Sequence, residues 1–259
     1  MRIIALEYHD VVADRGWDTS GFPGDAAATY KLSVERFGEH LAALSRASRR
    51  VTTDPTDAAA ATMPPVVLTF DDGGSGYIAF AADLLERHGW HGCVFMTTGQ
   101  IGKPGFLSAS DLRALHARGH LIGTHSRSHP VRMSALSPAD LLDEWRSSKA
   151  DLEDALGAAV DTGSVPGGYH SHIVAQTAAA AGLATLYTSE PESTPRLIDG
   201  CTVIGRYTLR QNDSAQYAAR LVTDSTARMV QWCRWNAKKV VKALGGTAYL
   251  RVRERMLKR

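Results

Sequence analysis

The 259-residue sequence has few cysteines, and none of them are paired in a motif. Cys93, Cys201 and Cys233 are odd in number, far apart and never spaced as CxxC. This pattern argues against a disulfide scaffold and against a thiolate zinc site, and it fits a reducing compartment. We expect each of the three to be a small buried apolar residue.

Long apolar runs are also absent. No stretch of 18 apolar residues occurs, so no transmembrane helix is predicted. The N-terminus, MRIIALEYHDVV, lacks the longer apolar core and the small-residue cleavage site of a signal peptide, and we interpret it as a first strand. We therefore predict a cytoplasmic location, although a chain from which a leader had been removed would look the same. No GxGxxG follows a predicted strand, which argues against a Rossmann nucleotide enzyme.

The charge is unevenly distributed along the chain. The whole chain has a net charge of +2, but residues 228–259 hold ten Lys or Arg and one acid, leaving about −7 on residues 1–227. We divide the chain at this point into a main domain, 1–227, and a basic tail, 228–259. The tail is either a solvated helix or an amphipathic segment that contacts the anionic inner face of the cell membrane. No nucleic-acid-binding motif accompanies the charge. Apolar residues interleave with these charges at Met229, Val230, Trp232, Trp235, Val240, Val241 and Leu244.

Short apolar runs alternate with helix-like segments through the rest of the sequence. Hydrophobic residues make up 44% of the chain, which is enough for one large core. Seven strands alternating with helices predict an α/β fold with a parallel sheet, open or closed. The expected strands are Ile3–Tyr8, Val66–Phe70, Gly92–Thr97, Leu121–Thr124, Thr162–Val165, Ala184–Thr188 and Thr202–Tyr207. The expected helices are Ser33–Arg46, Tyr77–His88, Ser108–Arg118, Ser137–Leu156 and His172–Ala181.

Unusual polar residues follow these strands, at the point where each strand ends. The carboxyl ends of parallel strands meet at one face in α/β folds, so residues scattered in the sequence would converge there. The long segment Val11–Tyr30 follows the first strand, and we expect it to form part of a substrate groove on that face. The strand-end residues are His9, Asp71, Asp72, His125, His129, the segment PGGYH at 166–170, and Arg206.

Two histidines and two acids in this set indicate a metal site. His125 and His129 are four residues apart, and one carboxylate added to them gives a His₂-carboxylate set typical of catalytic zinc. Asp71 and Asp72 are adjacent, so one of them can bind the ion while the other stays free as a base. A bound metal would lower the pKa of water, to around 7 in favourable zinc sites. The alternatives are two surface histidines on a loop and an Asp–Asp turn that caps a helix.

The same residues carry a family resemblance. TFDDG at 69–73 and HSRSHP at 125–130 resemble the first two motifs of the polysaccharide deacetylases, the NodB-homology or carbohydrate esterase family 4 proteins. Both motifs match at every position, and the resemblance covers roughly residues 1–210. It implies a distorted (β/α)7 barrel and metal-dependent removal of an acetyl group from an N-acetylated sugar. It also implies that Asp71 is the catalytic base and that Asp72, His125 and His129 bind a divalent ion, with zinc expected and cobalt or nickel as alternatives.

The third motif of that family departs from its usual form in this chain. The family pattern is Arg-x-Pro-Tyr or similar, whereas residues 164–168 read SVPGG. Pro166 fits, and the Gly167 N–H can still donate to an oxyanion, with Tyr169 expected on the substrate side. Ser164 stands where the family has the arginine that steadies the base. We expect Arg206, from the seventh predicted strand, to supply that guanidinium.

The last motif of the family, Leu-x-His, supplies the general acid and is missing here, because no histidine follows His172. LEYHDV at 6–11 resembles instead the N-terminal Tyr-His segment of the permuted members, such as poly-N-acetylglucosamine deacetylases. His9 matches their acid histidine, and Asp10 or another acid would orient it. The alternative is that His9 is a buried structural histidine.

The resulting prediction is a hydrolase that removes N-acetyl groups from an N-acetylhexosamine-containing glycan or glycan precursor, as in exopolysaccharide biosynthesis. A cytoplasmic location would favour a nucleotide-linked or lipid-linked sugar over mature cell wall. Two alternatives are a cyclic-amide hydrolase of the same superfamily and a carbohydrate-binding pseudoenzyme. The native metal, the particular sugar and the oligomeric state are left open by the sequence.

Overall fold

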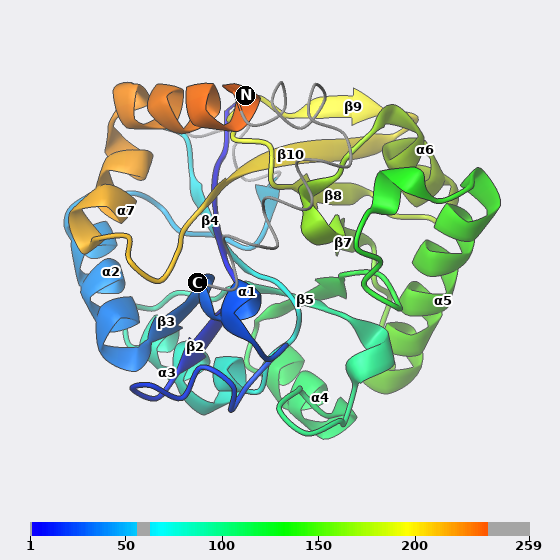
Figure 1. Cartoon of the computed structure of the whole chain (residues 1–259), viewed down its shortest axis with the longest axis horizontal. Helices are drawn as coiled ribbons and strands as arrows, with labels where there is room; N and C mark the ends of the chain where they lie inside the picture. The colour runs from blue at the N-terminus through cyan, green and yellow to red at the C-terminus, as the bar shows by residue number, and fades with distance from the viewer. Residues whose placement is uncertain (1, 56–62, 238–259) are drawn as a thin grey trace.

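The computed structural model describes residues 2–55 and 63–237 (Figure 1). Its centre is a closed ring of seven parallel strands, in which β1 pairs with β4 on one side and with β10 on the other. The predicted distorted (β/α)7 barrel is therefore confirmed. A short strand, β9 (Arg196–Ile198), adds to β10 in the antiparallel sense. The barrel strands, in order around the ring, are β1 (Ile4–Tyr8), β4 (Val66–Phe70), β5 (Cys93–Met96), β6 (Leu121–Thr124), β7 (Thr162–Ser164), β8 (Thr185–Thr188) and β10 (Cys201–Thr208).

All seven predicted strands occur, and their ends differ from the predicted ends by no more than one residue. The prediction missed β2 (Asp10–Val12), which pairs in parallel with β3 (Lys31–Ser33) beside the barrel. It also missed β9 and the four-residue helix α1 (Asp25–Ala28). These elements are too short for a hydrophobic period to be visible in the sequence.

Helices surround the barrel, and neighbours pack against each other, α2 on α7, α4 on α5 and α5 on α6. The predicted helix start at Ser137 is confirmed, since its Oγ accepts a hydrogen bond from the Asp140 N–H. The predicted helix over 77–88 begins as a π-helical turn, Tyr77–Ala81, before it continues as α3. The α-helices are α2 (Val34–Arg46), α3 (Ala82–Glu86), α4 (Ala109–Ala117), α5 (Pro138–Leu156), α6 (His172–Ala180) and α7 (Ala215–Thr223).

The interior of the barrel changes from apolar to polar along each strand. Because successive side chains point to opposite faces of a strand, every second residue faces inward. Ala5, Val67 and Ile204 belong to a buried apolar cluster contributed by strands from around the ring. Two residues further along each of these strands come Glu7, Thr69 and Arg206, all of them buried. The carboxyl end of the barrel is therefore lined with polar groups, as the strand-end residues predict.

Residues 225–237 form a further helix after α7, at the upper edge of Figure 1. The predicted boundary at residue 227 falls inside this helix; residues 238–259 of the predicted tail lie outside the described residues. Cys93 and Cys201 are buried as expected, but Cys233 is exposed because it lies on the outer side of this helix. Within the part of the chain that the structure describes, no helix is both long enough and apolar enough to cross a bilayer.

Candidate active site

Asp71 forms a buried ion pair with Arg206 at the carboxyl end of the barrel. The two guanidinium nitrogens Nη1 and Nη2 donate to Oδ1 and Oδ2 of Asp71, each over 2.7 Å. Arg206 is 0% exposed and Asp71 is 2% exposed, so water does not screen the pair. A planar guanidinium that donates twice to a carboxylate fixes both the position and the orientation of the carboxylate. Asp71 is thus held rigidly, with its charged form favoured.

Two further side chains hold the Arg206 guanidinium in place. Nη2 of Arg206 lies 3.3 Å from Oε1 of Glu7 and donates to Oγ of Ser164 over 2.8 Å. Oγ of Ser164 also lies 3.3 Å from Oδ2 of Asp71. The small Ser164 side chain leaves the space that the guanidinium occupies. Arg206 therefore reaches Asp71 from β10, at the position where the sequence had led us to expect a guanidinium.

The electrostatic balance at Asp71 favours the carboxylate. Burial alone would raise the pKa of Asp71, but Arg206 and His125 outweigh it and hold that pKa well below its usual range. The group of Asp71, Glu7 and Arg206 carries a formal net charge of −1 when all three are ionised. It can therefore accept one proton without building up positive charge in the interior.

Asp72, His125 and His129 form a second cluster directly beside this ion pair. Oδ1 of Asp72 lies 3.5 Å from Nε2 of His125 and 3.4 Å from Nε2 of His129. One ligand atom of each of the three side chains lies within 4.8 Å of the other two. Zinc bonds to histidine nitrogen and carboxylate oxygen are about 2.0–2.2 Å long, and ligand atoms 3.4–3.5 Å apart fit one ion between them. The residues present therefore fit a divalent metal.

The protonation of His125 also suits a metal ligand. Nδ1 of His125 lies 3.1 Å from the Ser164 carbonyl oxygen, to which it can donate, leaving Nε2 free to bind an ion. Burial lowers the pKa of His125 to about 4 despite the opposing charge of Asp71. The neutral imidazole, which is the form that binds metals, therefore prevails at neutral pH.

The backbone places these ligands through conformations that are unusual for residues other than glycine. Asp72 has φ 73° and His129 has φ 54°, both in the left-handed region, and Ser126 between the histidines has φ 63°. Such residues cost of order 1 kcal/mol or more each, and they persist where the surrounding structure holds them. The strain sits on two of the three candidate ligands.

The glycines that follow Asp72 lie tightly packed against other parts of the chain. A Cβ on Gly73 would stand 2.0 Å from Sδ of Met96, and a Cβ on Gly74 would stand 2.0 Å from Oδ2 of Asp10. A Cβ on Gly76 would meet the Val11 carbonyl oxygen at 2.0 Å. The glycine-rich turn therefore wraps around β2 and the Asp10 carboxylate.

His9 lies beside the Asp71 ion pair at the end of β1. One ring nitrogen of His9 and carboxylate oxygens of Glu7 and Asp71 lie within 4.8 Å of one another. The ring stacks on Tyr30 with a centroid distance of 4.6 Å. Nδ1 of His9 is buried and has no hydrogen-bond partner among the described residues. Of the acids expected to orient His9, Asp10 does not face it, because its carboxylate accepts from the Val11 N–H and faces the glycine turn. Glu7 and Asp71 are the acids near the His9 ring.

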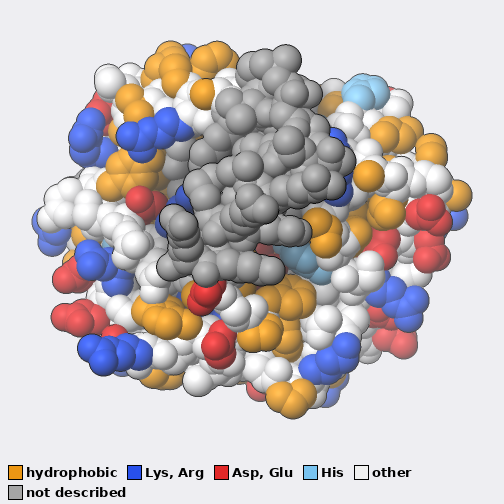
Figure 2. Space-filling view, in the orientation of Figure 1, with side chains coloured by type: hydrophobic (Ala, Val, Ile, Leu, Met, Phe, Trp, Pro, Cys, Tyr) orange, Lys and Arg blue, Asp and Glu red, His pale blue; other side chains and the backbone are white. Residues whose placement is uncertain are grey.

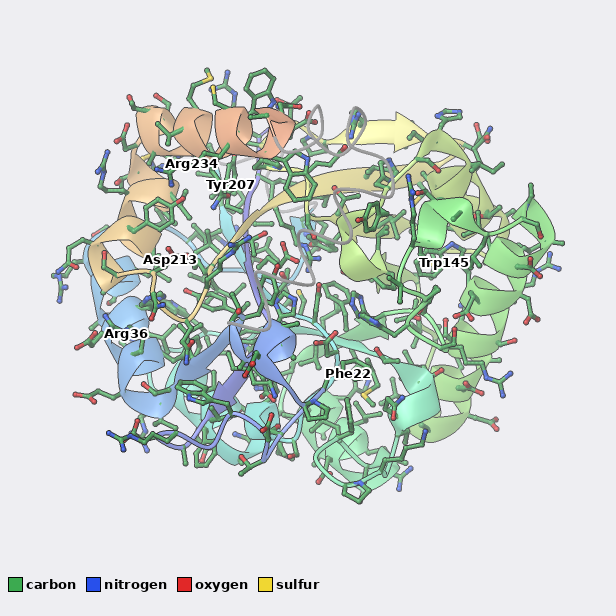
Figure 3. All side chains as sticks on the ribbon, viewed as in Figure 1. Phe22, Arg36, Trp145, Tyr207, Asp213 and Arg234 are labelled. Atoms are coloured by element: carbon green, nitrogen blue, oxygen red, sulfur yellow. The ribbon has the colours of Figure 1, made fainter. Side chains whose placement is uncertain are left out.

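Gly167 and Tyr169 lie in the loop that follows β7. Gly167 has φ 64° and is exposed, and the Tyr169 ring lies 5.2 Å from the Arg132 guanidinium carbon in the loop after β6. The segment between β2 and β3, which we expected to form a groove, approaches the metal cluster from another side. Its Phe22 ring, labelled in Figure 3, lies 4.9 Å from the ring of His129.

The ammonium of Lys31 fixes that segment to the barrel. It donates to the carbonyl oxygens of Trp17, Ser20 and Phe22, and the Lys31 side chain is almost fully buried. Three hydrogen bonds from one charged group hold the segment in a single conformation. Phe22 is therefore a fixed wall beside His129.

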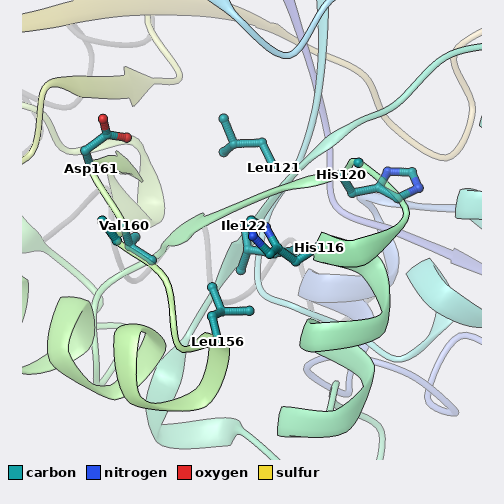
Figure 4. A pocket seen from close by; sticks show the side chains of 9 residues that line it. His116, His120, Leu121, Ile122, Leu156, Val160 and Asp161 are labelled. Carbon is teal, nitrogen blue, oxygen red and sulfur yellow. The ribbon is translucent and has the colours of Figure 1, made fainter.

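A separate cavity of about 310 Å³ opens where β6 and β7 begin (Figure 4). His116, Leu121, Val160 and Asp161 line it. It lies at the amino ends of the strands, whereas Asp71, Asp72 and the two histidines lie at the carboxyl ends. The polar cluster at the carboxyl ends is thus the candidate active site.

Comparison with known proteins agrees with this arrangement. Residues 59–186 match the family model described as polysaccharide deacetylase. Just under half of the chain is therefore similar to the polysaccharide deacetylases. The matched segment contains Asp71, Asp72, His125 and His129, whereas His9 and Arg206 lie outside it.

The similar proteins include one curated relative and several solved structures. The relative, from Bacillus subtilis (strain 168), is named "Putative polysaccharide deacetylase YxkH" and is 24% identical over 131 residues. The match covers 51% of this chain and 47% of the relative, so the chain spans about half the length of the relative that it matches.

Two solved structures cover most of the chain. The Streptococcus pyogenes deacetylase PplD, solved in complex with acetate, has a TM-score of 0.71 at 18% identity, over 86% of this chain and 98% of that one. IcaB from Ammonifex degensii has a TM-score of 0.68 at 20% identity, over 85% and 97% of the two chains. At these identities the likeness shows the barrel fold.

Glu7 is the site residue that our sequence interpretation missed. Glu7 follows the apolar residues Ile4, Ala5 and Leu6, so its charge suggests only that the strand ends at this position. The available signal is its spacing, because Glu7 is two residues before His9 and shares the inward face of β1 with Ala5. An acid on the inward face of a buried strand needs a cationic partner, and Arg206 is that partner.

Proposed function

We propose that this chain is a metal-dependent deacetylase that removes N-acetyl groups from an N-acetylhexosamine-containing glycan or glycan precursor. The observation that carries the proposal is the Asp71–Arg206 ion pair directly beside the Asp72, His125 and His129 cluster. One acid is free to act as a base while its neighbour takes part in a metal-binding set. The match of residues 59–186 to the polysaccharide deacetylase family model supports the same reaction class.

The metal set would hold one divalent ion, for which zinc is the first candidate and cobalt or nickel the next. Such an ion supplies Lewis-acid polarisation of a carbonyl and lowers the pKa of water. Two neutral imidazoles and one carboxylate leave positions open for other ligands, as in catalytic zinc sites.

The chain's own residues then supply the proton transfers. Asp71 accepts a proton from a water molecule as the water oxygen bonds to the acetamide carbon. Arg206 keeps Asp71 ionised and oriented until that step. His9, in its protonated form, donates a proton to the nitrogen as the carbon–nitrogen bond breaks, and the products are acetate and a free amine. The Gly167 N–H donates a hydrogen bond to the developing oxyanion, and Tyr169 lies beside it on the substrate side.

The substrate class follows from the setting we propose for the protein. The unpaired Cys93 and Cys201, both buried, support a cytoplasmic location. A nucleotide-linked or lipid-linked acetylated sugar, as used in exopolysaccharide assembly, is the substrate available there. A cyclic-amide hydrolase would use the same metal set and base, and the test below separates the two reactions.

The test measures acetate released from N-acetylglucosamine oligomers by the full chain, with zinc, cobalt or nickel added in turn. We expect the nearly isosteric Asp71→Asn variant to lose at least about a hundredfold in kcat. His9→Ala should lose kcat with little change in KM, because a proton donor acts on the leaving group. His116→Ala, at the opposite end of the barrel, is the matched control and should keep full activity.

Four results would argue against the proposal. Full activity in Asp71→Asn would exclude Asp71 as the base. Full activity in His9→Ala would exclude His9 as the general acid but would leave the proposed metal set unaffected. Metal binding without acetate release from any acetylated glycan would favour a carbohydrate-binding protein without catalysis. Opening of a cyclic amide, with glycans untouched, would favour the cyclic-amide hydrolase.

A further inference from the structure

The helix of residues 225–237 turns an apolar face toward solvent. Met229 is 59% exposed, Val230 is 42% exposed and Trp232 is 43% exposed. We call these three residues the outer face of the helix. Hydrophobic side chains gather at the upper edge of the space-filling view, over this helix, with Lys and Arg side chains nearby (Figure 2). A contiguous exposed apolar patch on a surface helix indicates an interaction site.

The inner side of the same helix buries Ala227 in the core and makes polar contacts with the end of β10 and with α7. Nε2 of Gln231 donates to the Thr208 carbonyl oxygen over 2.9 Å, and Nη1 of Arg228 donates to the Leu221 carbonyl oxygen over 2.8 Å. Amphipathic surface helices ordinarily bury the apolar stripe and expose the polar one. Here several polar side chains face inward and three large apolar ones face outward, so the outer face is free to meet an apolar medium.

The charge of the surrounding chain favours an anionic partner. Residues 228–259 carry a net charge of +9, whereas residues 1–227 carry about −7. An anionic surface would attract the C-terminal part of the chain and repel the barrel, which orients the molecule. Tryptophan and other apolar side chains beside clustered lysine and arginine are the composition of segments that lie in a membrane interface.

We propose that the outer face of helix 225–237 binds the surface of an anionic lipid bilayer. The helix lies at the rim of the candidate active site, since Gln231 contacts the end of β10 and the Trp235 ring lies against Gly168 after β7. Docking through this helix would hold the carboxyl end of the barrel close to the lipid surface. The binding does not depend on the deacetylase reaction, so the two can fail separately.

The test is co-sedimentation of the full chain with vesicles of phosphatidylcholine alone or mixed with phosphatidylglycerol. We expect binding only to the anionic vesicles and its loss in high salt. The variant with Met229→Ser, Val230→Ser and Trp232→Ser should bind at least about tenfold more weakly, because apolar burial is removed. Leu197→Ser is the matched control: Leu197 is 74% exposed on β9, outside the outer face, and its loss should leave binding unchanged.

A second readout places the contact at the helix itself. Cys233 is exposed while Cys93 and Cys201 are buried, so an environment-sensitive fluorophore attached to the native chain reports mainly from the helix. Its emission should shift to the blue when anionic vesicles are added. The proposal is overturned if the triple variant binds as tightly as the parent, or if the chain binds RNA but not vesicles. It is also overturned if the triple variant converts a dimer to a monomer without any vesicle binding in the parent.

Discussion

Replacement of Arg206 tests the strongest electrostatic feature of the site. In Arg206→Ser the guanidinium is lost, and Asp71 and Glu7 remain buried in the barrel with no cation between them. Oxygen atoms of the two carboxylates lie within 4.8 Å of each other. With an effective dielectric constant of about 20, two charges at that separation repel by about 3 kcal/mol. The expected loss of folding stability is of the same order, about 3 kcal/mol, as for other broken buried pairs.

The same repulsion changes the ionisation of the base. About 3 kcal/mol corresponds to roughly two pKa units. In the variant one proton is therefore retained by the Asp71–Glu7 pair to a higher pH, and the base is available only in the deprotonated fraction. We expect the acid limb of acetate release to move to higher pH by roughly two units, and release at neutral pH to fall because the Asp71 carboxylate is no longer held in one orientation.

The assay is acetate release as a function of pH, with urea unfolding of the same variants measured in parallel. Arg206→Lys should be intermediate, because an ammonium keeps the charge but cannot donate to both oxygens in a fork. Arg196→Ser is the control, since Arg196 is 48% exposed and its pair with Glu190 should contribute at most about 1 kcal/mol. An Arg206→Ser profile with an unmoved acid limb would refute the reasoning.

Two further predictions concern metal binding and pH. Zinc added to chelator-treated protein should raise Tm by several degrees in the parent but not in His129→Ala, measured by calorimetry; an equal rise in both would exclude His129 as a ligand. Burial raises the pKa of Asp10 to about 6, so the folded chain holds this proton more tightly than the unfolded chain. The protonated carboxyl therefore contributes to the free energy of unfolding below about pH 4, and this contribution is lost as the pH rises through about 6. Asp10→Asn should therefore gain about 3 kcal/mol relative to the parent between about pH 4 and pH 8 in urea unfolding, and parallel pH curves would contradict this.

The barrel strands were predictable because each is a short, fully buried apolar run bounded by polar residues. Val66–Phe70 is buried at every position, as expected for a parallel strand covered on both faces. The short sheet of β2 and β3 was not predictable, because it depends on tertiary contacts of the Asp10 carboxylate with the glycine turn. The exposure of Cys233 was also mispredicted, because its helix turns an apolar face toward solvent.

The candidate site was predictable as a set of residues but not as a geometry. Spacing pointed to His125 and His129, and the family resemblance pointed to Asp72. The left-handed backbone at Asp72 and His129 could not be recognised from the sequence, because neither residue is a glycine. The expectation for Arg206 came from its place near a strand end. Its bidentate contact with Asp71 depends on the register that sets Arg206 opposite Ala5, a long-range pairing that local pattern does not encode.

The orientation of Asp71 depends on the pairing of β1 with β10, which closes the barrel. Asp71 and Asp72 leave the ribosome before Arg206, because Arg206 lies on β10, the last barrel strand in the sequence. A nascent or truncated chain that lacks β10 holds an acid pair without its cation, and its base is neither aligned nor kept ionised. Under the proposed function, a chain in which β1 and β10 have not paired would lack an aligned base and would not hydrolyse its substrate.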